Sequence, residues 1–154
     1  MSLAFVARAE QDGFMSPELD VLLIEDDPFD AAAAQRALKE HPKVGDVIVM
    51  PSGERALGWL NNDTARNVGI VVLDMRLPGM SGIDVLRALK ANASLAHLPV
   101  IVLSINSDPS DLLEIYRQGA CAFLRKPDSV DGYRNMLDGV MRFWLLASWP
   151  SHTH

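Results

Sequence analysis

Short apolar runs alternate along this chain with longer segments in which apolar residues recur at helical spacing. Runs rich in Val, Ile and Leu are typical of buried strands, and the helical spacing is typical of helices with one apolar side. Strands are predicted at residues 20–25, 44–50, 69–74, 99–104 and 121–125. Helices are predicted at residues 30–40, 53–61, 83–92, 110–118 and 130–146. Ser52, which can cap a helix start, and Gly119, which can end a helix in the left-handed conformation, support these limits.

This alternation of strands and helices predicts an α/β fold with a parallel sheet. Parallel neighbours need a crossover connection, and a helix usually supplies it. Right-handed crossovers place the helices on both faces of the sheet, which explains why the strands are apolar throughout. We therefore predict a doubly wound, five-stranded parallel sheet with helices on both faces.

The composition predicts one domain. The 154 residues are 49% hydrophobic and 22% charged, enough for one good core and little more. We expect residues 1–18 to be a leader outside this core, residues 19–146 to form the domain, and residues 147–154 to be a tail.

Charge and cysteine content exclude several classes of function. The net charge is −6, and no cluster of Lys and Arg suggests a nucleic-acid footprint. No apolar stretch approaches the roughly 20 residues that span a bilayer, so neither nucleic acid nor membrane is expected as a partner. Cys121 is the only cysteine, which rules out an intramolecular disulfide, and we expect it to be a buried apolar residue in a cytoplasmic protein.

Charged residues stand where several predicted strands end. Glu25, Asp26 and Asp27 follow the first strand, Asp74 ends the third, and Lys126 follows the fifth. The carboxyl ends of parallel strands share one edge of the sheet, which is where such folds bind ligands. Clustered carboxylates favour a hard cation, and this set of oxygen ligands suits Mg2+.

Each of these residues also has a purely structural interpretation. Asp74 alone could cap a helix or form a turn, and the acidic triplet could complement the dipole of the following helix. Asp27 or Pro28 is expected to have that structural role. Only the joint placement of the acids and Lys126 at successive strand ends favours a functional site.

The predicted site suits phosphoryl chemistry. A carboxylate such as Asp74 can attack a phosphoryl group and form an aspartyl phosphate. Catalysis then needs charge neutralisation more than covalent help, and a divalent cation and Lys126 can supply it. Ser104, at the end of the fourth strand, adds a small hydroxyl that can bond a phosphoryl oxygen and move with it.

Four segments together resemble the receiver domains of two-component response regulators, over roughly residues 19–146. They are residues 22–28 (LLIEDDP), 71–82 (VVLDMRLPGMSG), 99–104 (PVIVLS) and 119–127 (GACAFLRKP). The resemblance implies the flavodoxin-like receiver fold. It also implies a role for each residue of the site: the phosphoacceptor Asp74, the metal ligand Asp26, the water-mediated ligand Glu25, the backbone carbonyl ligand Arg76, the phosphoryl-binding Ser104 and Lys126, and the switch aromatic Phe123. A packed core aromatic remains an equal alternative for Phe123.

The resemblance also implies a sensor histidine kinase as phosphoryl donor. Only one predicted helix and a tail follow residue 127, so we expect a single-domain response regulator. Its aromatic end, with Phe143, Trp144 and Trp149, is similar to that of the small receivers that pair with phytochrome kinases and form dimers. A homodimer is therefore expected, although packing of these aromatics onto the chain's own core is the alternative.

Two other functions fit the sequence less well than this switch. A receiver modifies only its own aspartate, so we do not expect a turnover enzyme. A hydrolase of the haloacid dehalogenase type would need an acid two residues after the nucleophile, where this chain has Arg76. A degenerate receiver that only binds or dimerises would have lost Asp74 or Lys126, and both are present.

Overall fold

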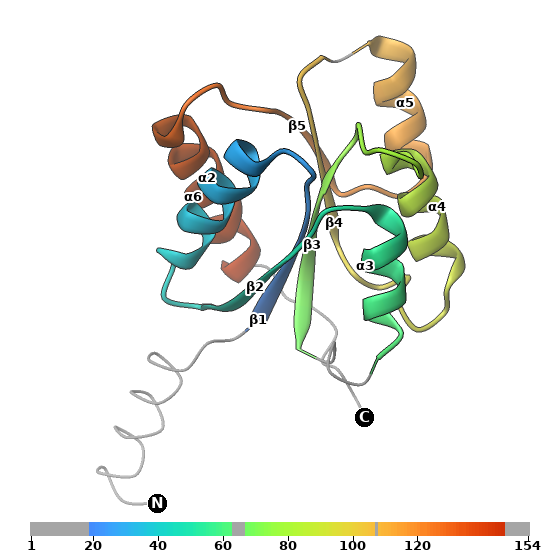
Figure 1. Cartoon of the computed structure of the whole chain (residues 1–154), viewed down its shortest axis with the longest axis horizontal. Helices are drawn as coiled ribbons and strands as arrows, with labels where there is room; N and C mark the ends of the chain where they lie inside the picture. Colours follow the sequence, from blue (N-terminus) through green and yellow to red (C-terminus); the bar gives the residue numbers. More distant parts are fainter. Residues whose placement is uncertain (1–18, 63–66, 107, 147–154) are drawn as a thin grey trace, which may run out of the picture.

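The computed structural model describes residues 19–62, 67–106 and 108–146, and within them strands and helices alternate (Figure 1). The expected leader, the expected tail and Trp149 lie outside the described residues. The strands are β1 (Leu19–Ile24), β2 (Val44–Met50), β3 (Val68–Asp74), β4 (Val100–Ser104) and β5 (Ala122–Arg125). The helices are α2 (Pro28–Lys39), α3 (Gly53–Leu60), α4 (Gly82–Ala91), α5 (Pro109–Arg117) and α6 (Val130–Leu146).

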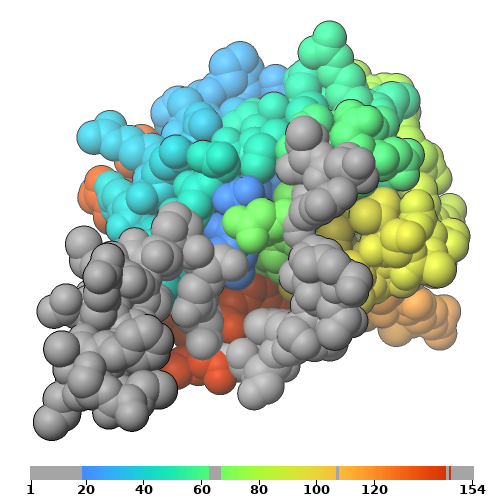
Figure 2. Space-filling view, turned by 90° about the horizontal axis from the view of Figure 1, so that it is seen from below, coloured from blue at the N-terminus to red at the C-terminus, as the bar shows by residue number. Residues whose placement is uncertain are grey.

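The strands form one parallel sheet in the order β2-β1-β3-β4-β5. The chain moves outward in opposite directions from the β1–β3 pair, so the loops that follow β1 and β3 diverge there. Such a topological switch point opens a crevice at the carboxyl ends of the strands. Figure 2 shows the opposite edge, where the starts of β1 and β3 (blue and green) lie side by side. The predicted fold class is confirmed.

Two layers of helices cover the sheet (Figure 1): α2 and α6 lie on one face, and α3, α4 and α5 lie on the other. Successive side chains of a strand point to opposite faces. In β1, Val21 and Leu23 pack under α2 and α6, whereas Leu22 and Ile24 pack into the core on the other side. Both sets are buried, which accounts for the unbroken apolar runs in the sequence.

Capping residues set the helix boundaries largely as predicted. The Asp27 side chain caps α2 by accepting from the Asp30 backbone N–H at 3.0 Å. Pro28 occupies the first turn, so α2 begins two residues earlier than the predicted residue 30, because proline at that position loses no hydrogen bond. Ser52 caps α3, and Gly119 has a φ of 99° after α5.

The prediction that Cys121 is buried is wrong. Cys121 is exposed because it stands directly before β5, which is an edge strand of the sheet. The aromatic end of α6 is divided: Met141 and Trp144 pack into the core, whereas Phe143 is 65% exposed. Among the helices described, none has the length and apolar character to cross a membrane.

Candidate functional site

The carboxyl edge of the sheet gathers the charged residues that the sequence placed at strand ends. Asp74 is the last residue of β3, and Glu25 and Asp26 follow β1 directly. Lys126 follows β5, and its backbone N–H donates to the Ser104 carbonyl at the end of β4 at 2.8 Å. Because β1, β3 and β4 are neighbours in the sheet, residues far apart in the chain meet at this edge.

The ammonium of Lys126 is shared by three carboxylates. Its Nζ lies 2.8 Å from Glu25 Oε2, 3.1 Å from Asp74 Oδ2 and 3.4 Å from Asp30 Oδ2. The lysine side chain is only 6% exposed, so these contacts are shielded from water. The structure thus places a buried positive charge directly beside the expected phosphoacceptor.

Glu25, Asp26 and Asp74 form a cluster in which one carboxylate oxygen of each lies within 4.8 Å of the others. Glu25 and Asp74 are buried, whereas Asp26 is exposed. Three converging hard oxygen ligands fit a divalent cation of the Mg2+ type. Arg76 lines the same cavity, and its backbone N–H donates to Asp74 Oδ1 at 3.1 Å. The role of the Arg76 carbonyl as a ligand stays a prediction.

Burial and nearby charges set the protonation of Glu25 and Lys126. Burial raises the pKa of Glu25 to about 7, and the charge of Asp74 adds to this rise, against the opposing hydrogen bond from Lys126. Burial alone would lower the pKa of Lys126, but the hydrogen bond to Glu25 and the charge of Asp74 outweigh it and raise the pKa. Lys126 therefore remains a cation in this site.

An open cavity of about 180 Å³ is lined by the acid cluster, Arg76 and Lys126, together with Asp27, Asp30 and Ile105. The volume is several times that of one water molecule, about 30 Å³. The cavity therefore has room for a hydrated cation or a phosphoryl group beside Asp74.

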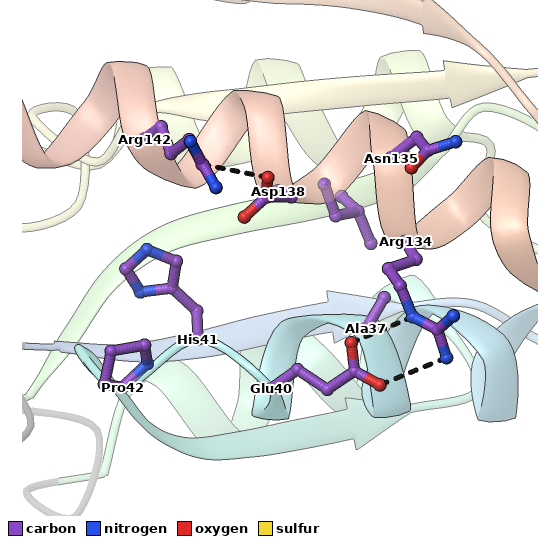
Figure 3. A pocket seen from close by; sticks show the side chains of 9 residues that line it. Ala37, Glu40, His41, Pro42, Arg134, Asn135, Asp138 and Arg142 are labelled. Carbon is purple, nitrogen blue, oxygen red and sulfur yellow. Dashed lines mark hydrogen bonds and ion pairs between the residues drawn. The ribbon is translucent and has the colours of Figure 1, made fainter.

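A larger cavity of about 490 Å³ lies between α2 and α6 (Figure 3). Its charged side chains are paired with each other. Arg134 makes a bidentate contact with the Glu40 carboxylate, and Arg142 Nε lies 2.9 Å from Asp138 Oδ2. None of the clustered acids lines it. Size therefore does not identify the site, and the smaller cavity holds the reactive groups.

Ser104 is buried at the end of β4, but its hydroxyl is engaged with the following loop. Its Oγ donates to the Asn106 carbonyl at 2.8 Å, and Ser104 is not among the residues that line the cavity. Phe123 is partly buried against the core on the α3–α5 side, and its backbone N–H donates to the Tyr116 hydroxyl at 3.1 Å. The switch roles of Ser104 and Phe123 stay predictions.

The structure adds three residues that the sequence did not indicate. Asp30 contacts Lys126, and the buried Tyr133 donates to Asp30 at 2.8 Å. Glu54, on α3, accepts from the Met80 N–H at 2.9 Å and so holds the loop that follows Asp74. Asp30 lies in the first turn of α2, three residues after the cap Asp27, so its position in the sequence indicates only a helix start and gives no signal of the contact with Lys126.

Known sequences that are similar to this chain include response regulators. A family model described as response regulator receiver domain matches residues 21–138. Response regulator Rcp1 of Synechocystis sp. is 27% identical over 134 residues, which cover 84% of this chain and 91% of Rcp1. Two-component response regulator ORR3 of Oryza sativa is 34% identical over 111 residues, which cover 72% of this chain and 82% of ORR3.

Solved structures match over most of the chain. The Mn2+-bound form of Rcp1 has a TM-score of 0.75 at 27% identity, covering 86% of this chain and 99% of Rcp1. The phosphorylated cyanobacterial phytochrome response regulator RcpA has a TM-score of 0.79 at 25% identity, covering 87% of this chain and 99% of RcpA. One relative thus holds a divalent metal ion, and the other is phosphorylated.

Proposed function

The chain belongs to the response regulator receiver domain family of two-component phosphorelays, and on that premise we propose that Asp74 is its phosphoryl acceptor. A receiver of this kind has a histidine kinase as its partner. The observation that carries the proposal is the buried Lys126 ammonium, 3.1 Å from Asp74 Oδ2 and beside the acid cluster. We take residues 19–146 as the receiver unit.

In the proposed reaction an Asp74 carboxylate oxygen attacks the phosphorus atom of a kinase phosphohistidine. The new O–P bond makes an acyl phosphate, while the N–P bond breaks and the imidazole leaves with its electron pair and takes up a proton. Lys126 neutralises charge on the phosphoryl oxygens as they pass through the transition state. The chain modifies only its own aspartate, which separates this function from that of a turnover enzyme.

Receiver domains of this family bind a divalent metal ion, and for this chain we propose Mg2+. Asp26 and Asp74 would bind it directly, Glu25 through water, and Arg76 through its backbone carbonyl. When bound, the ion supplies positive charge that offsets the phosphoryl oxygens. The converging carboxylate oxygens support this assignment, because three acids around one point repel each other unless a cation lies among them.

The proposed output is a change of surface. Ser104 would exchange its bond to Asn106 for one to a phosphoryl oxygen, and Phe123 would move inward in response. The added phosphoryl group carries roughly two negative charges at neutral pH, enough to bias a two-state element. Partner proteins would bind to the two forms of this surface with different affinity.

We further propose a phytochrome-type kinase as donor and a homodimer as the working assembly. RcpA, a phytochrome response regulator, supports the first proposal by its similarity over nearly its whole length. For the second, an apolar groove of about 270 Å³ lies between β5 and α6, lined by Phe143 among others, and Leu146 is 89% exposed nearby. A second copy would bury this surface. The cytoplasmic location stays a prediction.

Asp74-dependent phosphorylation tests the proposal directly. The protein is incubated with Mg2+ and acetyl phosphate, and phosphoryl incorporation is followed by intact mass spectrometry. Wild type should gain one phosphoryl group that Asp74→Asn lacks, whereas the exposed control Asp84→Asn should behave as wild type. Equal incorporation in Asp74→Asn would exclude Asp74 as acceptor. No incorporation in wild type, with folding intact, would favour a receiver that only binds or dimerises.

A phytochrome-type donor is a separate question. Wild type should take the phosphoryl group faster from an autophosphorylated phytochrome kinase than from an unrelated histidine kinase at equal concentration. Equal rates would remove support for that partner and leave the Asp74 proposal standing.

A further inference from the structure

The Lys126 ammonium has a third carboxylate partner outside the group of converging acids. Asp30 Oδ2 lies 3.4 Å from Nζ, and Asp30 is not a member of the Glu25, Asp26 and Asp74 cluster. It belongs to the first turn of α2. Lys126 is therefore held from the helical layer as well as from the strand ends.

Asp30 is itself fixed from α6. The Tyr133 side chain is fully buried, and its Oη donates to Asp30 Oδ1 at 2.8 Å. Its ring packs in the core beneath α2 and α6, which share one face of the sheet (Figure 1). A buried hydroxyl needs a partner, and this bond leaves the second oxygen of Asp30 directed at Lys126. The three side chains form a line from α6 through α2 to the reaction site.

We propose that Asp30 and Tyr133 are positioning residues that hold the Lys126 ammonium over Asp74 during phosphoryl transfer. This inference rests on the proposed function. Glu25 and Asp74 are expected to turn toward the cation and the phosphoryl group, so their attraction for Lys126 weakens as the reaction proceeds. Asp30 is bonded to Tyr133 and lies outside that group of acids, so its contact with the ammonium does not depend on the cation or the phosphoryl group.

Charge and position predict opposite effects for the Asp30→Asn variant. Removing a negative charge by itself should speed the approach of an anionic phosphodonor. Loss of the lysine anchor should slow the transfer instead. A slower reaction can therefore be attributed to lost positioning, and Tyr133→Phe provides a variant in which the charge of the site is unchanged.

The test measures labelling by acetyl phosphate with Mg2+ in Asp30→Asn, Tyr133→Phe and the exposed control Asp111→Asn, each with Lys126 and with Lys126→Met. We expect Asp30→Asn and Tyr133→Phe to label about fivefold to tenfold more slowly, which corresponds to the net contribution of one ordinary hydrogen bond. The control should label as wild type. In the Lys126→Met background the residual labelling should not fall further, because the group being positioned is gone.

A second readout needs neither metal nor phosphodonor. In the nitrogen-15 spectrum of the metal-free protein, a shielded lysine ammonium gives a slowly exchanging signal, which is assigned by its loss in Lys126→Met. Hydrogen exchange at this signal should accelerate several-fold in Asp30→Asn and Tyr133→Phe, with melting temperatures showing that both fold. The control should leave it unchanged.

Unchanged labelling and an unchanged ammonium signal in folded variants would overturn the inference. Equal losses with and without Lys126 would also overturn it, since they would mean that both residues act only on the fold. If only Asp30→Asn responds, the part assigned to Tyr133 is wrong. If wild type takes no phosphoryl group, the proposed function fails, while the ammonium signal still decides whether the anchor exists.

Discussion

Ser104 donates its hydroxyl hydrogen to the Asn106 carbonyl at 2.8 Å, although this hydroxyl is the group expected to reach a phosphoryl oxygen on Asp74. A hydroxyl has one hydrogen to donate and serves one strong acceptor at a time. A phosphoryl contact would therefore require the bond to Asn106 to break. Phosphorylation of Asp74 would in this way be coupled to the loop after β4 through one hydrogen bond of Ser104.

Ser104→Ala should separate phosphorylation from the conformational response. Asp74 should still be labelled, but the change in tryptophan fluorescence on adding beryllofluoride and Mg2+ should shrink. Loss of the bond to Asn106 should also lower the free energy of unfolding by about 1 kcal/mol. Ser104→Thr keeps the hydroxyl and should retain the response. A full fluorescence change in Ser104→Ala would show that Ser104 has no part in the conformational response.

Asp26→Asn should make the protein insensitive to Mg2+. Wild type should be stabilised by about 2.7 kcal/mol when Mg2+ is at one hundred times its dissociation constant. The variant should lose most of this gain, yet without Mg2+ it should be at least as stable as wild type, because one of the repelling charges is gone. Thermal unfolding with Mg2+ and with a chelator measures both effects. The exposed control Asp46→Asn should respond to Mg2+ as wild type does.

Tyr133 should make the protein sensitive to alkaline pH. Burial and the hydrogen bond to Asp30 raise the pKa of Tyr133 above that of an ordinary phenol. Above about pH 10 the unfolded chain releases this proton while the folded state still keeps it. The free energy of unfolding is therefore unaffected by Tyr133 below about pH 10 and falls as the pH rises further. In urea unfolding at pH 9 and pH 11, wild type should lose more stability than Tyr133→Phe. An equal loss in both would contradict the raised pKa.

Phe143→Asp should weaken the proposed dimer. Phe143 is 65% exposed beside the apolar groove, so a charge there should cost association without disturbing the core. Sedimentation equilibrium should show the variant as a monomer at concentrations where wild type associates. Leu113→Asp changes a residue on α5 that is 52% exposed, and it is the matched control. A wild-type protein that stays monomeric at all the concentrations measured would contradict the proposed dimer.

Substitution by alanine should have opposite effects on the free energy of unfolding at Gly119 and at Gly58. Gly119 has a φ of 99°, which alanine adopts only with strain, so Gly119→Ala should cost about 1 to 2 kcal/mol of unfolding free energy. Gly58 lies exposed within α3, and an added Cβ meets nothing within 4 Å. Gly58→Ala should therefore stabilise the protein by about 0.5 to 1 kcal/mol. Chemical unfolding of both variants measures the contrast.

The fold could be predicted because its signals are local. Each strand is apolar throughout and each helix has one apolar side, so periodicity and a few caps suffice to order the elements. The convergence of the site residues could be predicted because all the strands of a parallel sheet end at one edge, whatever their order. The exposure of Cys121 could not, because which strand lies at the edge depends on the order β2-β1-β3-β4-β5.

The order of residues was enough to predict the alternating α/β pattern, the resemblance to the receiver family and the placing of Glu25, Asp26, Asp74 and Lys126 at strand ends. The packed fold was needed to show that Asp30 and Tyr133, 103 residues apart, meet beside Lys126, and that Trp144 is buried while Phe143 is exposed. These contacts form between helices that pack on the same face of the sheet. Local patterns show which side of each helix is apolar, but the atoms that touch are settled only when α2 and α6 are packed together.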